Sequence, residues 1–109
     1  MKFRRERLSS LIRAELSRMV ERDLEFPSGV LVTLTEVEVS PGLKEAAVKF
    51  VSFPSGVEDE AKRILDSRRN EFQSRLFKRL RIISVPRIRF EFDKGAENVA
   101  RVEKLIMEK

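Results

Sequence analysis

The residues of this chain best suited to binding chemistry gather between Lys62 and Arg89. This segment holds ten Lys or Arg residues and two Asp or Glu residues. Arginine predominates among its cations, and a guanidinium offers a planar fork of donors that suits phosphate oxygens and stacking on nucleic-acid bases. The segment therefore favours the binding of a polyanion, and an RNA backbone is the simplest partner of that kind.

The cations of residues 75–81 fall on one side of a predicted helix. At about 100° per residue, the apolar positions share an arc of about 80° and the cations cover the neighbouring arc of about 160°. The apolar positions are Phe72, Leu76, Leu80 and Ile83, and the cations are Arg75, Lys78, Arg79 and Arg81. A solvated helix surface is the plain alternative. A membrane surface fits less well, because the apolar side is needed for the core.

Other chemistry has few residues to support it. The chain has no His, Cys, Trp or Tyr, which removes the usual general base, the commonest metal ligand and all thiolate chemistry. No carboxylate spacing matches a metal-binding loop, and solvated strand edges and loops are the simpler interpretation of residues such as Glu36 and Glu38. We expect no enzyme activity, no catalytic residues, no metal and no cofactor.

Charge is distributed unevenly along the 109 residues. It is +4 over residues 1–22, −6 over 23–61, +8 over 62–89 and −1 over 90–109, which sums to +5. The electrostatic attraction for a polyanion would therefore be concentrated at the two basic segments. From charge alone, Arg4, Arg5 and Arg7 are a possible extension of an RNA-binding surface. With no apolar run near the roughly 18 residues of a membrane span, we expect a soluble cytosolic protein.

Hydrophobic spacing predicts a single α+β domain over residues 1–109, with a three-stranded sheet and helices packed on one face. The predicted order is helix, strand, strand, helix, helix, strand and a terminal helix. The alternation of the first strand changes phase near Thr35 and Glu36, which predicts a β-bulge there. The polar run from Ser67 to Asn70 predicts a break between the two central helices. The terminal helix is expected at about 95–108, partly frayed.

Three segments resemble ribosome-binding factor A: "RRERLSSLIRAELSRMVERDL", "VTLTEVEVSPGLKEAAVKFVS" and "LFKRLRIISVPRIRFEFD". The resemblance extends over nearly the whole chain. It implies a K-homology-like domain of type II topology, in which a helix-kink-helix carrying Ala-x-Gly takes the place of a Gly-x-x-Gly loop. Arg68 and Asn70 stand where Ala and Gly are expected. Because Asn accepts a left-handed backbone more readily than most residues, we expect Asn70 to supply the kink.

Proteins of that family are assembly factors of the small (30S) ribosomal subunit. The resemblance implies binding of the free subunit, late maturation and processing of 16S ribosomal RNA without catalysis, and a link to cold adaptation. We expect a monomer when the protein is free. Two alternatives stay open: a K-homology-like module for another RNA, and a protein-interaction domain with an acidic partner. The residues that the resemblance assigns to RNA contact, on the kink and the following helix, are Arg68, Arg69, Asn70, Arg75, Lys78, Arg79 and Arg81.

Overall fold

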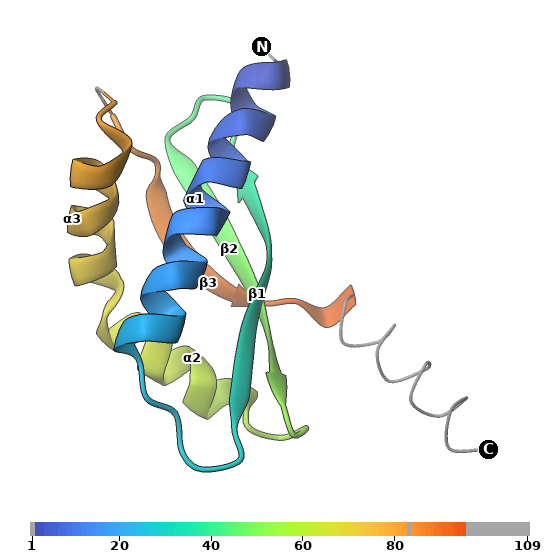
Figure 1. The fold of residues 1–109 in the computed structure, drawn as a ribbon. Helices are drawn as coiled ribbons and strands as arrows, with labels where there is room; N and C mark the ends of the chain where they lie inside the picture. The colour runs from blue at the N-terminus through green and yellow to red at the C-terminus, as the bar shows by residue number, and fades with distance from the viewer. Residues whose placement is uncertain (1, 83, 96–109) are drawn as a thin grey trace.

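Six elements make up the part of the chain that the computed structural model describes, residues 2–82 and 84–95 (Figure 1). Their predicted order is confirmed. The terminal helix predicted for about 95–108 lies outside the described residues from residue 96 onward. The elements are α1 (Lys2–Asp23), β1 (Leu31–Val39), β2 (Glu45–Phe53), α2 (Glu58–Ser67), α3 (Arg69–Leu80) and β3 (Arg87–Phe92).

The three strands form one mixed sheet in the order β1-β2-β3. Strands β1 and β2 are an antiparallel hairpin, whereas β3 runs parallel to β2, with Glu45 opposite Arg87 and Phe50 opposite Phe92. A parallel neighbour requires a crossover connection, and α2 with α3 provides it. The register of the hairpin shifts between Leu34 and Glu36. This shift confirms the predicted bulge, which keeps Val37 and Val39 on the same face as Leu34.

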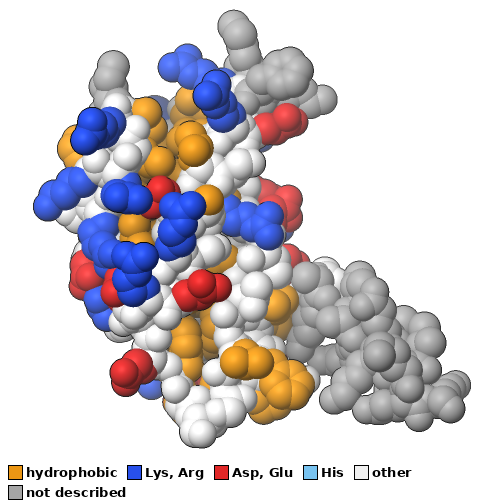
Figure 2. Space-filling model, viewed as in Figure 1, with side chains coloured by type: hydrophobic (Ala, Val, Ile, Leu, Met, Phe, Trp, Pro, Cys, Tyr) orange, Lys and Arg blue, Asp and Glu red, His pale blue; other side chains and the backbone are white. Residues whose placement is uncertain are grey.

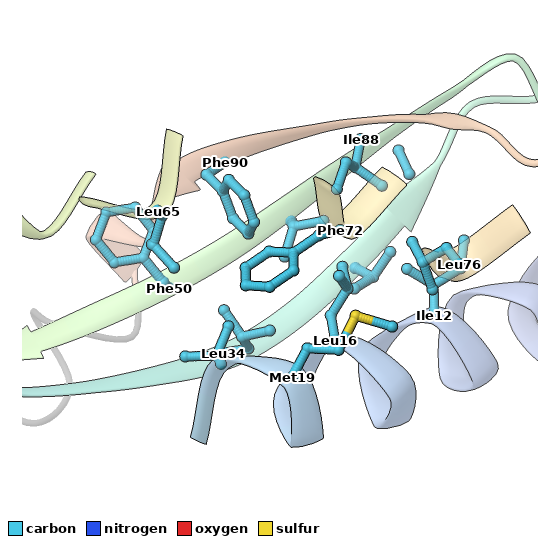
Figure 3. Packing of buried hydrophobic residues seen from close by; sticks show 14 of the residues in the cluster. Ile12, Leu16, Met19, Leu34, Phe50, Leu65, Phe72, Leu76, Ile88 and Phe90 are labelled. Carbon is cyan, nitrogen blue, oxygen red and sulfur yellow. The ribbon is translucent and has the colours of Figure 1, made fainter. Parts of the chain in front are cut away.

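The core lies between one face of the sheet and all three helices. Phe50 and Phe90 from the sheet, Phe72 from α3, Leu65 from α2 and Leu16 from α1 are almost completely buried. Figure 3 places the Phe72 ring between the strands and α1. Burying one such side chain stabilises the fold by roughly 1.5–3 kcal/mol relative to exposure. The predicted packing of helices on one face is therefore confirmed, and it fixes how α1 and α3 sit relative to each other.

The break between α2 and α3 is at Arg68, with φ −111° and ψ 6°. The Arg68 N–H donates to the Leu65 carbonyl at 3.2 Å, and the Phe72 N–H donates to the Arg68 carbonyl at 3.0 Å. The prediction that Asn70 supplies a left-handed kink is wrong, because Asn70 lies in the first turn of α3 and has no positive φ. The bridge-region conformation of Arg68 is open to ordinary L-residues, so this break needs neither Gly nor Asn.

Two features fix the orientation of α3 relative to the sheet: a side-chain contact with β3 and the conformation of the residue that ends the helix. The Gln73 side chain accepts a hydrogen bond from the Ile88 N–H at 2.8 Å and donates one to the Pro86 carbonyl at 2.9 Å. This amide therefore pairs with the outer edge of β3 as a neighbouring strand would. The helix ends at Arg81, which adopts the left-handed conformation with φ 51° and ψ 40°. Together these features orient the cationic side of α3.

Candidate nucleic-acid interface

Helices α1 and α3 lie side by side on the helical face of the sheet (Figure 1). Ile12 and Leu16 turn one side of α1 into the core, and helical geometry places a stripe of mostly charged residues about 100° around the helix from them, along the edge that faces α3. Figure 2 shows Lys and Arg side chains gathered over α3 and this part of α1. The stripe consists of Arg4, Leu11, Glu15, Arg18 and Arg22.

A notch of about 110 Å³ lies between the two helices. Glu15 lies in its wall and accepts hydrogen bonds from Arg18 Nη1 and Arg79 Nε, both at 3.2 Å. The side chains of Arg18 and Arg79 remain 60% and 62% exposed, whereas that of Glu15 is 19% exposed. The lining comprises Glu15, Arg18, Met19, Arg22, Arg75 and Arg79. Its charged groups are four guanidiniums and one carboxylate.

A second group of charges surrounds the kink. Arg75 Nη1 lies 2.5 Å from Asp23 Oδ2 at the end of α1 and 3.5 Å from Glu71 Oε2. Arg68 binds both Glu71 oxygens at 2.8 and 2.9 Å, donates to the Asp23 carbonyl at 3.2 Å, and lies 5.6 Å from the centre of the Phe72 ring. These two guanidiniums join α1 to the kink, so their main contacts are within the protein.

These contacts shift the pKa values of Asp23, Glu71 and Arg68, in each case in favour of the charged form. The hydrogen bond from Arg75, with the charges of Arg75, Arg22 and Arg68, lowers the pKa of Asp23 below its ordinary value of 3.8. The hydrogen bond between Arg68 and Glu71 lowers the pKa of Glu71 and raises the pKa of Arg68. All of these groups are therefore held in their charged forms at neutral pH.

The seven residues predicted to contact RNA do not lie together. Lys78 on α3 and Arg81 just after its end are exposed, and neither forms a side-chain hydrogen bond or ion pair within the described part of the chain. Arg69 turns toward β3, where it lines a separate groove with Lys62, Asp66 and Arg87. Arg75 and Arg79 lie at the notch, and Arg68 lies at the kink. Asn70 is exposed in the first turn of α3.

The three arginines predicted near the N-terminus also separate. Arg4 and Arg7 are exposed, and neither forms a hydrogen bond or ion pair with the described residues. Arg5 instead donates from Nε to the Val39 carbonyl at 3.1 Å, so it lies over the end of the edge strand β1. This contact removes Arg5 from the side of α1 that faces α3.

Sequence reasoning left Arg18 and Arg22 out of the predicted surface. Both line the notch, together with Arg75 and Arg79. A helical projection of α1 could have found them, because they are four residues apart and share the stripe of Glu15. What the projection could not give is the partner across the notch, since Arg79 is 64 positions further along the chain.

One exposed aromatic lies on the other side of α3. Phe77 is 56% exposed, although its neighbour Leu76 is completely buried. At about 100° per residue, Phe77 lies about 40° around the helix from Gln73, which binds the edge of β3, and so turns away from α1. It is therefore not part of the surface shared by α1 and α3.

Residues 2–82 and 84–95 hold neither a carboxylate metal site nor a membrane-spanning helix. No three Asp or Glu side chains come together there as a possible metal site. None of the helices in these ranges is long and apolar enough to cross a bilayer.

The model of the family described as ribosome-binding factor A matches residues 4–106. Ribosome-binding factor A of Cupriavidus metallidurans is 39% identical over 103 residues, which covers 94% of this chain and 82% of that protein. A solution structure of a Thermotoga maritima protein described as a ribosome binding factor A has a TM-score of 0.73 and 30% identity, and the match covers 87% of this chain and 92% of that one.

A second similar structure concerns a complex. A homology model of Thermus thermophilus ribosome binding factor A, fitted into a cryo-electron-microscopy map of a 30S complex, has a TM-score of 0.66 and 25% identity. The match covers 77% of this chain and 89% of that one. These neighbours have a K-homology-like fold, so the predicted fold class is confirmed.

Proposed function

The chain belongs to the ribosome-binding factor A family, and from this premise we propose that it binds the free small ribosomal subunit through 16S ribosomal RNA. In this proposal it supports late maturation of the subunit and processing of that RNA in the cytoplasm, as a monomer when free. It catalyses no reaction and acts by favouring one conformation of the RNA to which it binds.

The observation that carries the proposal is a row of exposed cations across α1 and α3, which we call the basic face. Each phosphate that such a cation neutralises releases condensed counterions, so the row would supply affinity that depends on salt. Among the described residues, Lys78 and Arg81 have no side-chain partner, and Arg79 uses only its Nε group. The basic face comprises Arg4, Arg7, Arg18, Arg22, Lys78, Arg79 and Arg81.

The charges on the opposite face of the sheet also favour the binding of RNA to the helical face. Two of the three strand cations on that opposite face pair with acids on the same surface: Lys49 Nζ lies 2.8 Å from Glu38 Oε1, and Arg89 lies 3.1 Å from Glu91 Oε1. The third, Arg87, forms no ion pair with the described residues. A polyanion approaching that face would meet carboxylates beside each of the two paired cations. The helical face therefore fits RNA better than the sheet face does.

A salt titration tests the proposal. The full chain is sedimented with free small subunits at increasing salt, and the logarithm of affinity is plotted against that of salt concentration. Replacing Lys78, Arg79 and Arg81 by Ala should make this line shallower by about one unit for each phosphate that is no longer neutralised. The matched control replaces three exposed cations elsewhere, Arg63, Arg87 and Arg89, and should leave the slope nearly unchanged. Equal slopes in the two variants would remove the basic face from the mechanism.

The same sedimentation separates the two alternatives. A K-homology-like module for another RNA would bind that RNA and leave free small subunits in the supernatant. A protein-interaction domain with an acidic partner would keep its complex after ribonuclease treatment. Co-sedimentation with free small subunits that is abolished by ribonuclease treatment is the result expected here.

A further inference from the structure

Glu15 connects arginines of two helices through a single carboxylate. Oε1 accepts from Arg18 on α1, and Oε2 accepts from Arg79 on α3, 64 positions further along the chain. The Glu15 side chain is 19% exposed, whereas its two partners are about three-fifths exposed. The carboxylate is therefore the recessed member of the group, and the guanidiniums form its outer surface.

The geometry of these contacts leaves donors available. Arg79 uses Nε, so both of its Nη groups remain without a partner among the described residues. Arg18 uses Nη1, so its Nε and Nη2 groups are likewise free. Arg22 lines the same notch. Of the four arginines that line the notch, Arg75 is paired with Asp23 outside it. Three guanidiniums and the one carboxylate of Glu15 remain, so the net charge of the notch stays positive.

We propose that this notch holds a backbone phosphate of the bound RNA, and that Glu15 is a positioning residue that fixes Arg18 and Arg79 for it. The inference rests on the proposed function and deepens it by naming one contact. A phosphodiester of RNA fits because the notch lies within the basic face, where Arg22 and Lys78 continue the row of cations on either helix. A polymer of phosphates could engage the whole row, whereas a single anion could not.

Two opposing effects decide the role of Glu15. Its negative charge repels a phosphate, but this repulsion is screened by water and by the two guanidiniums that surround it. Against this, two long side chains that are already ordered need not be immobilised when RNA binds. At a solvent-exposed site the second effect should be larger. Glu15 should therefore increase the affinity for a polyanion, although it is itself an anion.

The sign of this effect gives the test. Affinity for free small subunits is measured at one salt concentration for the wild type, Glu15→Gln and Glu21→Gln. Both substitutions remove one negative charge from α1, but Glu21 is exposed and forms no hydrogen bond or ion pair with the described residues. Glu15→Gln should bind about three- to tenfold more weakly than the wild type, because the cost of ordering two side chains on binding exceeds the repulsion that the substitution removes. Glu21→Gln should bind equally or slightly more tightly.

Glu15→Asp removes any ambiguity from charge or folding. It keeps the net charge but shortens the side chain, so it should not reach both arginines at once, and its affinity should fall as that of Glu15→Gln does. Thermal unfolding of each variant is followed by circular dichroism to establish that the fold is retained. Affinities of Glu15→Asp and Glu15→Gln that equal or exceed the wild-type value would overturn the inference while leaving the proposed function intact.

A second probe tests the phosphate site separately from binding to small subunits. Hexauridylate is titrated into the labelled full chain, and the side-chain N–H signals of Arg18 and Arg79 are followed by NMR. If the wild type did not bind small subunits, the proposed function would fail. Shifts of both signals that weaken in Glu15→Gln would nevertheless support a phosphate site in the notch. Signals that do not move in the wild type would reject it.

Discussion

Arg75 on α3 and Asp23 at the end of α1 form an ion pair, with 2.5 Å between Nη1 and Oδ2. Arg75 also lies 3.5 Å from Glu71, which in turn binds Arg68 at the kink. The pair therefore joins the end of α1 to the middle of α3, and Glu71 connects it to the kink. One of the arginines predicted to contact RNA thus has a structural role at the junction of two helices.

The Asp23–Arg75 pair should make stability depend on pH in the acid range. The pKa of Asp23 is lowered in the folded state, so its stabilising contribution is complete above the ordinary value of 3.8 and is lost as pH falls through the folded pKa. The free energy of unfolding of Asp23→Asn should lie below that of the wild type by a constant amount near neutral pH. Below about pH 4 the two should converge, as urea unfolding over a pH series would measure.

Glu25 provides the control for this prediction. It is an exposed carboxylate two residues from Asp23, and it forms no ion pair with the described residues. The Glu25→Gln variant loses the same charge without breaking the contact to Arg75. The same pH-dependent difference in both variants would show that the ion pair is not its source.

Substitution of Arg75 should mainly affect stability, whereas substitution of Arg79 should mainly affect RNA binding. Arg75→Ala leaves Asp23 without its closest partner and should lower the melting temperature more than Arg79→Ala does. Arg79 is 62% exposed, so removing its pair with Glu15 should cost less than about 1 kcal/mol. Arg79→Ala should instead reduce the salt slope of small-subunit binding by about one unit.

Unfolding and salt titration of the two variants together check this pattern. The exposed pair Arg89–Glu91 on the sheet face offers a matched control, because Arg89 is 56% exposed and lies 3.1 Å from its glutamate. Arg89→Ala should change neither the slope nor, by more than a small amount, the stability. A larger loss of stability for Arg79→Ala than for Arg75→Ala would contradict the assignment.

Much of the fold could be predicted because its signals are local. The change of phase near Thr35 predicted the bulge, since a strand alternates every two residues and one extra residue reverses the pattern. The parallel direction of β3 was not predicted, because it depends on how α2 and α3 cross the sheet. Asn70 was misassigned because the kink was inferred from residue type, while the observed break at Arg68 uses a conformation open to most residues.

The candidate site was less predictable than the fold. Composition indicates a cationic side of α3, but it cannot say which guanidiniums bind carboxylates of the protein itself. Arg68 reaches the Asp23 carbonyl across 45 positions, and Arg79 reaches Glu15 across 64. These partners are set by the packing of α1 against α3, which no local pattern encodes.

Gln73 should contribute measurably to stability through the start of β3. Gln73→Ala leaves the Ile88 N–H and the Pro86 carbonyl without their side-chain partner, which should cost about 1–3 kcal/mol in the free energy of unfolding. Gln73→Glu keeps the acceptor but loses the donor, so urea unfolding should place it between the wild type and Gln73→Ala. An unchanged unfolding midpoint in Gln73→Ala would mean that water replaces the amide at no cost.

Arg81 should show opposite effects on stability and on RNA binding. Its left-handed backbone, with φ 51°, costs an L-residue roughly 1–2 kcal/mol, whereas Gly adopts it freely. Gly also gains entropy in the unfolded chain, which offsets about 0.5–1 kcal/mol of that benefit. Arg81→Gly should therefore raise the free energy of unfolding slightly, by up to about 1 kcal/mol, and should lower the affinity for small subunits because it removes one cation of the basic face.

Arg81→Ala completes the comparison, because it removes the same cation but retains the strain at this position. It should match Arg81→Gly in affinity and fall below it in stability. Urea unfolding and salt-dependent sedimentation of both variants provide the two measurements. Equal stabilities would show that the end of α3 relaxes without cost. Wild-type affinity in both would exclude Arg81 from the RNA contact, and the basic face would then depend on the cations nearer the notch.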